Sequence, residues 1–200
     1  MPVEIREVDS GTVEDLSSLF STDKGAAACW CMWFIIPVKD YHAAGGRGNQ
    51  ASFRELMASS GQPLGLVAYR DGVPVGWCAV GPRSRYARAI RTPTYKGRDP
   101  DEDDDVWLLP CIFVRPDARR SALCAELIGS AVRLAKARGA AAIEAFPLSG
   151  RKRRSNETQV GFEPAFAACG FTVKNRPSDA RALMRLDFNP DREARPSRRS

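Results

Sequence analysis

Two arginines and a serine stand where the chain passes from a long apolar segment into a helix. The apolar segment covers residues 106–114, and residues 119–124 have the sequence RRSALC. The first turn of a helix presents backbone N–H groups without intrahelical acceptors at the positive end of the helix dipole, so it attracts anions. Arginine adds charge-assisted hydrogen bonds to phosphate. The pattern predicts an anion site made by Arg119, Arg120, Ser121, Ala122, Leu123 and Cys124.

This stretch contains no glycine, the residue that best allows a backbone to come close to a phosphate. Ala122 is compatible with right-handed helical angles, but the Cys124 side chain would crowd an anion if it pointed inward. The alternative interpretation is an ordinary strand-to-helix turn with solvated arginines.

The elements around this stretch predict a bulged central strand followed by an amphipathic helix. Residues 106–114 are continuously apolar, which is typical of a strand covered on both faces. Pro110 cannot donate a hydrogen bond within a sheet, so it predicts a bulge there. The following helix ends at Gly139 and leads to a strand over residues 141–148, which a right-handed crossover sets parallel to the first. The helix has one apolar face, formed by Leu123, Leu127, Ala131, Leu134 and Ala135.

The remaining pattern completes a mixed α/β (α+β) fold. Alternation over residues 3–8 predicts a first strand. Helices follow near residues 12–20, with Thr12 as the N-cap and Asp15 at the third helical position, and near residues 49–60, capped by Asn49 or Ser52. Asp71-Gly72 predicts a hairpin, and residues 86–105 predict a long surface loop. A short helix over 163–170 and a final strand pair complete the fold. We expect one domain, residues 1–188, with a largely antiparallel sheet, helices on both faces and a basic, disordered tail over 189–200.

Composition limits the classes of function. The chain has 200 residues, of which 44% are hydrophobic, and its apolar runs are too short to span a membrane, so we expect a cytoplasmic protein with one core. The six cysteines are scattered and His42 is the single histidine, which disfavours a metal site. The net charge of +6 is concentrated in residues 151–154 and 189–200 without a nucleic-acid-binding motif, so nucleic acid is a disfavoured partner.

Five segments, in this order, resemble the GNAT superfamily of N-acetyltransferases, and in particular a bacterial subgroup. They are residues 29–34, 64–86, 111–128, 137–148 and 166–188, and the third contains the position of the superfamily's Q/R-x-x-G-x-G/A loop, with Arg119 as its first residue. The resemblance implies that the loop binds the pyrophosphate of acetyl-CoA, which serves as cosubstrate without a metal. It also implies that pantetheine lies along Ile112, Phe113 and Val114, beside the bulge where the sheet splays. The thioester carbonyl then meets a backbone N–H near Ile112.

Acetyl transfer to an amine needs a base for the ammonium and an acid for the leaving thiolate. GNAT enzymes often carry a carboxylate on the bulged strand, but residues 106–114 contain none, so Glu144 on the next strand is the first candidate for the base. The alternative is a buried carboxylate held by residues 151–154 or by backbone. The resemblance also implies that the superfamily's usual acid, a tyrosine, is replaced by Phe166. Tyr41, Tyr86, Cys169 and solvent then remain as candidates for the acid.

The acceptor pocket in this fold is lined by the N-terminal helices and their loop, which implies Trp30, Trp33 and Tyr41 as its walls; the alternative is that the tryptophans are plain core. The acidic residues 99–105 either attract a cationic amine or form a solvated loop. The predicted function is direct, acetyl-CoA-dependent transfer to a primary amine of a small molecule. The alternatives are a GNAT-fold binding protein without catalysis and a protein- or tRNA-directed acetyltransferase, and a homodimer is left open.

Overall fold

A computed structural model of the chain describes residues 2–119, 121–150 and 159–188. Arg120, the basic stretch 151–154 and the predicted tail 189–200 therefore lie outside the described residues. The described strands form one seven-stranded sheet in the order β1-β2-β3-β4-β5-β7-β6, and of its neighbouring pairs β4 and β5 run parallel. The strands are β1 (Val3–Glu7), β2 (Gly65–Arg70), β3 (Val73–Pro82), β4 (Val106–Val114), β5 (Ala142–Ala145), β6 (Thr172–Ser178) and β7 (Arg181–Asp187).

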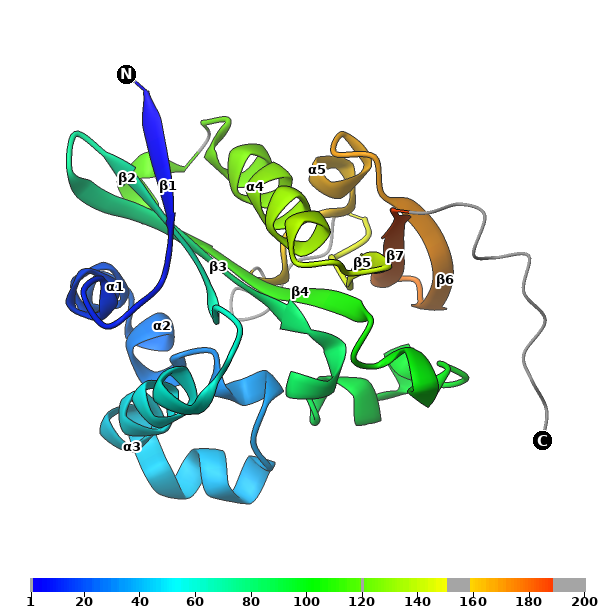
Figure 1. Ribbon diagram of the computed structural model, residues 1–200, viewed down its shortest axis with the longest axis horizontal. Coiled ribbons are helices and arrows are strands. Elements are labelled where there is room, and N and C mark those ends of the chain that lie inside the picture. Colours follow the sequence, from blue (N-terminus) through cyan, green and yellow to red (C-terminus); the bar gives the residue numbers. More distant parts are fainter. Residues whose placement is uncertain (1, 120, 151–158, 189–200) are drawn as a thin grey trace.

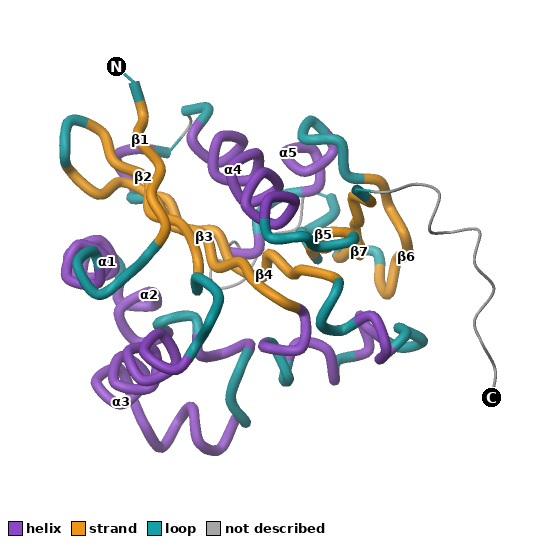
Figure 2. The backbone as a smooth tube through the Cα atoms, in the orientation of Figure 1, coloured by secondary structure: helices purple, strands orange, loops and turns teal. Residues whose placement is uncertain are grey.

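Helices cover both faces of this sheet, as Figures 1 and 2 show. On one face lie α1 (Val13–Ser21), α2 (Lys24–Cys29) and α3 (Val38–Ser59), and on the other lie α4 (Leu123–Ala137) and α5 (Glu163–Ala167). Single turns of 3-10 helix occupy the connections: η1 (Met32–Phe34), η2 (Arg83–Arg85), η3 (Ala89–Arg91), η4 (Pro93–Tyr95), η5 (Pro100–Glu102) and η6 (Pro116–Ala118). The predicted mixed, largely antiparallel fold is confirmed.

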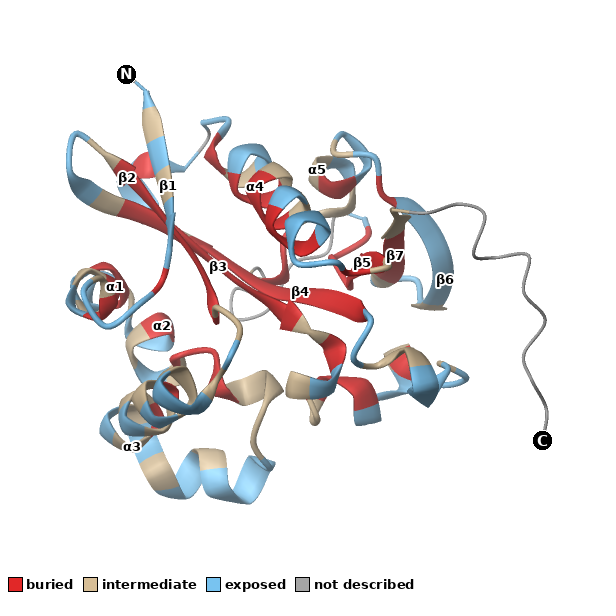
Figure 3. Cartoon of the chain, in the orientation of Figure 1, coloured by how far each residue is buried: buried red, intermediate tan, exposed pale blue. Residues whose placement is uncertain are grey.

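Two apolar cores fix the central strands between these helix layers. The apolar face predicted for α4 is buried, and it packs against β2, β3 and β4 (Figure 3). On the opposite face, Trp77 of β3 and Phe113 of β4 each meet Phe20 of α1 edge to face, at 6.1 and 5.8 Å between ring centroids. Because β3 and β4 are buried on both faces, packing against the helices fixes the position of these two strands.

The predicted bulge and splay occur in β4. Opposite β3, the register passes from Ala79↔Cys111 to Gly81↔Leu108, so β4 has one extra residue around Pro110. The pairing of β4 with β5 ends at Leu108↔Glu144, while β5 remains paired with β7. Within the described residues, β4 therefore continues from Leu109 to Val114 without a strand partner on the β5 side.

Three local predictions differ from the structure. Helix α3 begins at Val38, much earlier than expected, and passes a kink at Gly45, where φ is 60°. Asn49 does not cap a helix but lies buried in α3, where its amide donates to the Ala28 carbonyl at 2.8 Å. Thr12 precedes α1 without a side-chain capping bond, because its hydroxyl is bonded to Asp9 instead, accepting from the Asp9 N–H at 2.9 Å. The Asp15 carboxylate accepts from the Tyr69 hydroxyl at 2.8 Å.

The connection between β3 and β4 is not the surface loop that its polarity predicted. Tyr86, Ile90 and Tyr95 are buried in a third apolar cluster together with Leu108 of β4 and Phe146, which follows β5. Aromatic residues spaced along a polar segment therefore anchor this connection on the sheet, and it becomes one wall of the site.

Candidate active site

A cleft of about 1080 Å³ opens beside the splayed end of β4. Its walls come from the α2–α3 region, from the connection between β3 and β4, and from the segments that follow β4 and β5. The lining residues are Asp23, Gly25, Cys29, Trp33, Phe34, Tyr41, His42, Arg88, Ala89, Thr92, Thr94, Arg119, Phe146, Gln159, Val160 and Arg181. The cleft thus brings together the predicted anion-site residue Arg119 and the predicted acceptor-site residues Trp33 and Tyr41.

The start of α4 adopts a helical geometry without glycine. Ala122 precedes the helix with φ −66° and ψ −3°, angles that a residue with a side chain adopts without strain. Ser121 donates to the Ala118 carbonyl at 2.8 Å and accepts from the Leu123 N–H at 3.4 Å. The half-buried Cys124 packs against the core, and burial, followed by the nearby Cys169, raises the pKa of its thiol. Its side chain is therefore directed to the packed side of the helix.

Arg119 and Ser121 are exposed beside this helix start. Arg119 donates from Nε to the Val114 carbonyl at 3.1 Å, which holds the side chain next to the last residue of β4. The guanidinium group and the first-turn N–H groups of α4 therefore lie close to the end of the unpaired strand edge.

An arginine and an aromatic cluster form the opposite wall. The Arg88 guanidinium carbon lies 3.4 Å above the centre of the Trp33 ring, and its Nη1 donates to the Trp33 carbonyl. Trp33 also meets Tyr41 edge to face at 5.1 Å and His42 at 6.1 Å. Four side chains from η1, α3 and the β3–β4 connection thus support one another at the cleft.

Burial keeps two groups of this wall protonated at neutral pH. Burial raises the pKa of the Cys29 thiol to about 11. Burial also raises the pKa of Tyr41, and the neighbouring Cys29 adds to the shift. Cys29 and Tyr41 are therefore neutral proton donors rather than anions in the cleft.

Several predicted residues lie outside the cleft lining. Ile112 and Phe113 are buried, with the Phe113 ring packed on α1, and with Val114 they form the strand edge that leads to the cleft. Trp30 is 4% exposed and packs on Phe20 at 5.2 Å between ring centroids, so it belongs to the core, as the alternative interpretation had it.

Glu144 also lies outside the cleft, in a separate, charged cavity lined in part by Arg83 and Arg185. Its carboxylate accepts from Arg83 Nη1 and from Arg185 Nη1, each at 3.1 Å, and its side chain is 4% exposed. Burial alone would lower the pKa of Arg83. The negative charges and hydrogen bonds of Glu144 and Asp103 have the larger effect, so the pKa of Arg83 is raised. A base must lie within hydrogen-bonding reach of the substrate, and Glu144 faces two guanidinium groups outside the cleft. The geometry does not fit the predicted role of Glu144 as the base.

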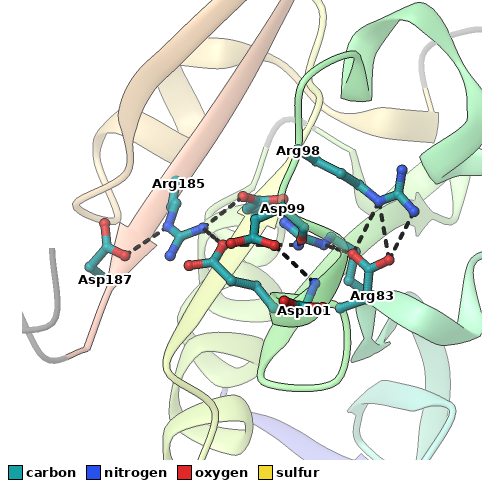
Figure 4. A network of polar contacts seen from close by, with 9 residues as sticks. Arg83, Arg98, Asp99, Asp101, Arg185 and Asp187 are labelled. Carbon is teal, nitrogen blue, oxygen red and sulfur yellow. Dashed lines mark hydrogen bonds and ion pairs between the residues drawn. The ribbon is translucent and has the colours of Figure 1, made fainter. Parts of the chain in front are cut away.

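Part of the acidic run is held by arginines of the same network (Figure 4). Asp103 pairs with Arg83 at 2.7 Å and with Arg98 at 3.0 Å, and Glu102 pairs with Arg185 at 3.1 Å. These two acidic residues therefore anchor the β3–β4 connection.

Comparison with known proteins identifies the family. The family model "Acetyltransferase (GNAT) family" matches residues 30–156, which is more than half of the chain. The chain belongs to the GNAT family of acetyltransferases. No curated protein sequence matches this GNAT protein.

Solved structures share its fold at low sequence identity. One is yncA of Salmonella typhimurium with its cofactor acetyl-CoA, at 16% identity and a TM-score of 0.56, covering 94% of this chain and 95% of that one. Another is PaiA N-acetyltransferase of Thermoplasma acidophilum with coenzyme A, at 15% identity and 0.53, covering 94% and 100%. A third is an N-acetyltransferase of Staphylococcus aureus Mu50, at 16% identity and 0.57, covering 94% and 100%. At these identities the similarity shows the fold alone.

The structure also places the residues of this GNAT protein that are candidates for the general acid. Phe166, which takes the place of the superfamily's tyrosine, is fully buried and packs on Phe171 at 5.3 Å between ring centroids. Tyr86 is buried, and neither it nor Cys169 lines the cleft, whereas Tyr41 does. Of the proton donors suggested by the sequence, Tyr41 is the one at the cleft.

Three basic residues of the cleft were missed by the sequence analysis: Arg88, His42 and Arg181. His42 was considered as a metal ligand only. Arg88 and Arg181 carry no local signal, because each is one arginine among many and only the fold brings them to the same cleft. No helix within the described parts of the chain is long and apolar enough to cross a membrane.

Proposed function

We propose that this GNAT protein is an acetyl-CoA-dependent N-acetyltransferase that transfers the acetyl group directly to a primary amine of a small molecule. One observation carries the proposal. The edge of β4 that loses its partner after Leu108 leads directly to Arg119, to the start of α4 and to a cleft with proton-transfer groups. A strand edge, an anion site and a cleft in this order suit an extended ligand with a phosphate-bearing end.

The chain offers a place for each part of acetyl-CoA, which when bound supplies an acetyl group activated as a thioester. Arg119 and the first-turn N–H groups of α4 would hold the pyrophosphate. The edge formed by Ile112, Phe113 and Val114 would hold the pantetheine arm, and a backbone N–H near Ile112 would stabilise the negative charge on the thioester oxygen. The right-handed angles of Ala122 and the packed position of Cys124 support this fit.

Two residues of the cleft take the proton-transfer roles in the proposal. His42 accepts the proton of the acceptor ammonium, directly or through water, since Asp23, the carboxylate among the lining residues, already caps α2 through bonds to the Gly25 and Ala26 N–H groups at 2.9 and 3.0 Å. Tyr41 donates to the leaving thiolate. Cys29 stays protonated because of its raised pKa, so it does not act as a nucleophile and the transfer is direct.

The proposal is tested by titrating the protein with acetyl-CoA in a calorimeter and then measuring CoA release with a panel of primary amines. We expect micromolar binding and amine-dependent release of CoA. An absence of acetyl-CoA binding at high micromolar protein would rule the enzyme out.

The replacement of the superfamily's tyrosine by the buried Phe166 supports a second candidate, a binding protein without catalysis. This candidate predicts acetyl-CoA binding without CoA release for any amine of the panel.

A further inference from the structure

Arg88 lies at the cleft, and no carboxylate pairs with it among the described residues. Its partners are the Trp33 ring and the Trp33 carbonyl. Arg83 and Arg98 of the same connection are instead both paired with Asp103 away from the cleft. The guanidinium group at the cleft is therefore held by an aromatic ring and a carbonyl, with no counter-charge in the part of the chain that the structure describes.

The position of Arg88 is nevertheless fixed. Its flat face lies on Trp33 and one of its five N–H groups is engaged by the Trp33 carbonyl, so the remaining edge is available in a defined orientation. Burial lowers the pKa of Arg88. The neighbouring groups that could supply a compensating negative charge are Tyr41 and Cys29, but their raised pKa values keep both of them neutral. A partly buried cation held in place without an anion is a costly arrangement unless a ligand completes it.

Two further arginines, Arg119 and Arg181, line the cleft. Among the described lining residues the carboxylate is Asp23, which is engaged as the cap of α2. Arg181 donates to the Phe146 carbonyl at 3.1 Å, and the Phe146 ring packs on Phe34, next to Trp33, at 5.5 Å. If Arg119 serves the cosubstrate, Arg88 remains beside the aromatic wall, where its positive charge disfavours a polyamine and favours an anion.

We infer that the acceptor is an amine that also carries an oxyanion, a carboxylate or a phosphonate, and that Arg88 binds this oxyanion. The inference rests on the proposed acetyltransferase function. The planar fork of a guanidinium matches either oxyanion with two parallel hydrogen bonds. Held in this way, the acceptor would keep its amine at a fixed distance from Arg88, within reach of the proton-transfer groups on the same wall.

The test compares matched acceptors in the acetyl-transfer assay with the full chain. The panel contains α-amino acids, the amines that result from their decarboxylation, the corresponding 1-aminoalkylphosphonates, and the polyamine spermidine. We expect at least a tenfold higher kcat/KM for one of the anionic series than for its matched amines, and the better series identifies carboxylate or phosphonate as the oxyanion. Equal or better turnover of the matched amines or of spermidine would overturn the inference, as would a failure of every anionic member to bind or react.

Variants of Arg88 assign the effect to this residue. Arg88→Gln should reduce kcat/KM for the anionic acceptor by about 10- to 100-fold and abolish its advantage over the matched amine, while Arg88→Lys retains part of it. The control is Arg91→Gln, an exposed arginine of the same connection that does not line the cleft; it should behave as wild type. Thermal unfolding of each variant checks that the fold is retained.

The calorimetric titration with acetyl-CoA distinguishes failure of the inference about Arg88 from failure of the proposed acetyltransferase function. If Arg88→Gln weakens acetyl-CoA binding instead of acceptor use, Arg88 serves the cosubstrate and the inference is wrong while the enzyme remains. If acceptor preference is independent of charge and of Arg88, the inference alone fails. If the wild type neither binds acetyl-CoA nor releases CoA, the proposed function fails and the inference fails with it.

Discussion

Glu144 and Arg83 form an ion pair across the central strand of the sheet, almost completely removed from solvent. Arg83 Nη1 lies 3.1 Å from Glu144 Oε2, and the two side chains are 2% and 4% exposed. Arg83 directly follows β3 and Glu144 lies in β5, with β4 between these strands. The pair therefore fastens the beginning of the β3–β4 connection to the far side of β4, and this connection carries Arg88 to the cleft.

Glu144→Gln should destabilise the fold rather than abolish chemistry. Removing one partner leaves buried guanidinium charge without compensation, which costs about 3 kcal/mol in the free energy of unfolding, measured by urea denaturation. The matched control is Glu102→Gln, because Glu102 pairs with Arg185 but is 42% exposed, and it should cost less than about 1 kcal/mol. Unchanged stability together with a hundredfold lower kcat would restore Glu144 as the base.

Arg119→Ala should weaken acetyl-CoA binding about tenfold, because a charge-assisted contact to phosphate is lost. Calorimetry measures the dissociation constant. Arg115→Ala is the control, since Arg115 belongs to the same turn but is paired with Asp117 at 2.6 Å and does not line the cleft. Equal losses in both variants would show a general effect of surface charge instead of a phosphate site.

Cys124→Gly tests whether the missing glycine matters. Since Cys124 packs against the core, its replacement should leave acetyl-CoA affinity within about twofold. It should lower the free energy of unfolding by about 1 kcal/mol, through the lost packing of the side chain together with the lower helix propensity of glycine. A marked gain in affinity would show that the side chain obstructs the phosphate after all.

The features that the sequence predicted well are those with local causes. The bulge at Pro110 follows from a missing N–H, the hairpin at Asp71-Gly72 from positive φ values of 51° and 76°, and the buried face of α4 from its spacing of apolar residues.

The features that the sequence missed depend on contacts between distant segments. Glu144 is 61 residues from Arg83 and 41 from Arg185 in the sequence. The local sequence shows only a single carboxylate within an apolar strand, so it did not reveal that both guanidinium groups bind this carboxylate. Arg88 and Trp33 are likewise 55 residues apart. Pairing across the sheet, rather than residue type, decided which charge is structural and which faces the cleft.

Cys29 should react slowly with alkylating agents despite lining the cleft. With a pKa of about 11, about one thiol in a thousand is ionised at pH 8, and the thiolate is the reactive form. Since the pKa is raised, the rate of iodoacetamide labelling at Cys29, followed by peptide mass spectrometry, should increase through pH 10 to 11. Cys29→Ser should retain acetyl transfer; a stable acetyl group on Cys29, or loss of activity in this variant, would contradict direct transfer.

His42→Gln should lower kcat by about 100-fold or more, because glutamine cannot accept the proton of the acceptor ammonium. The dissociation constant of acetyl-CoA should stay unchanged in this variant. Tyr41→Phe is the matched comparison. The pKa of Tyr41 is raised, so its hydroxyl stays protonated to higher pH than an ordinary tyrosine, and its loss should lower kcat and likewise leave acetyl-CoA binding unchanged. If His42→Gln retains the wild-type kcat, the proton leaves the acceptor by another route, and solvent at the open cleft becomes the base.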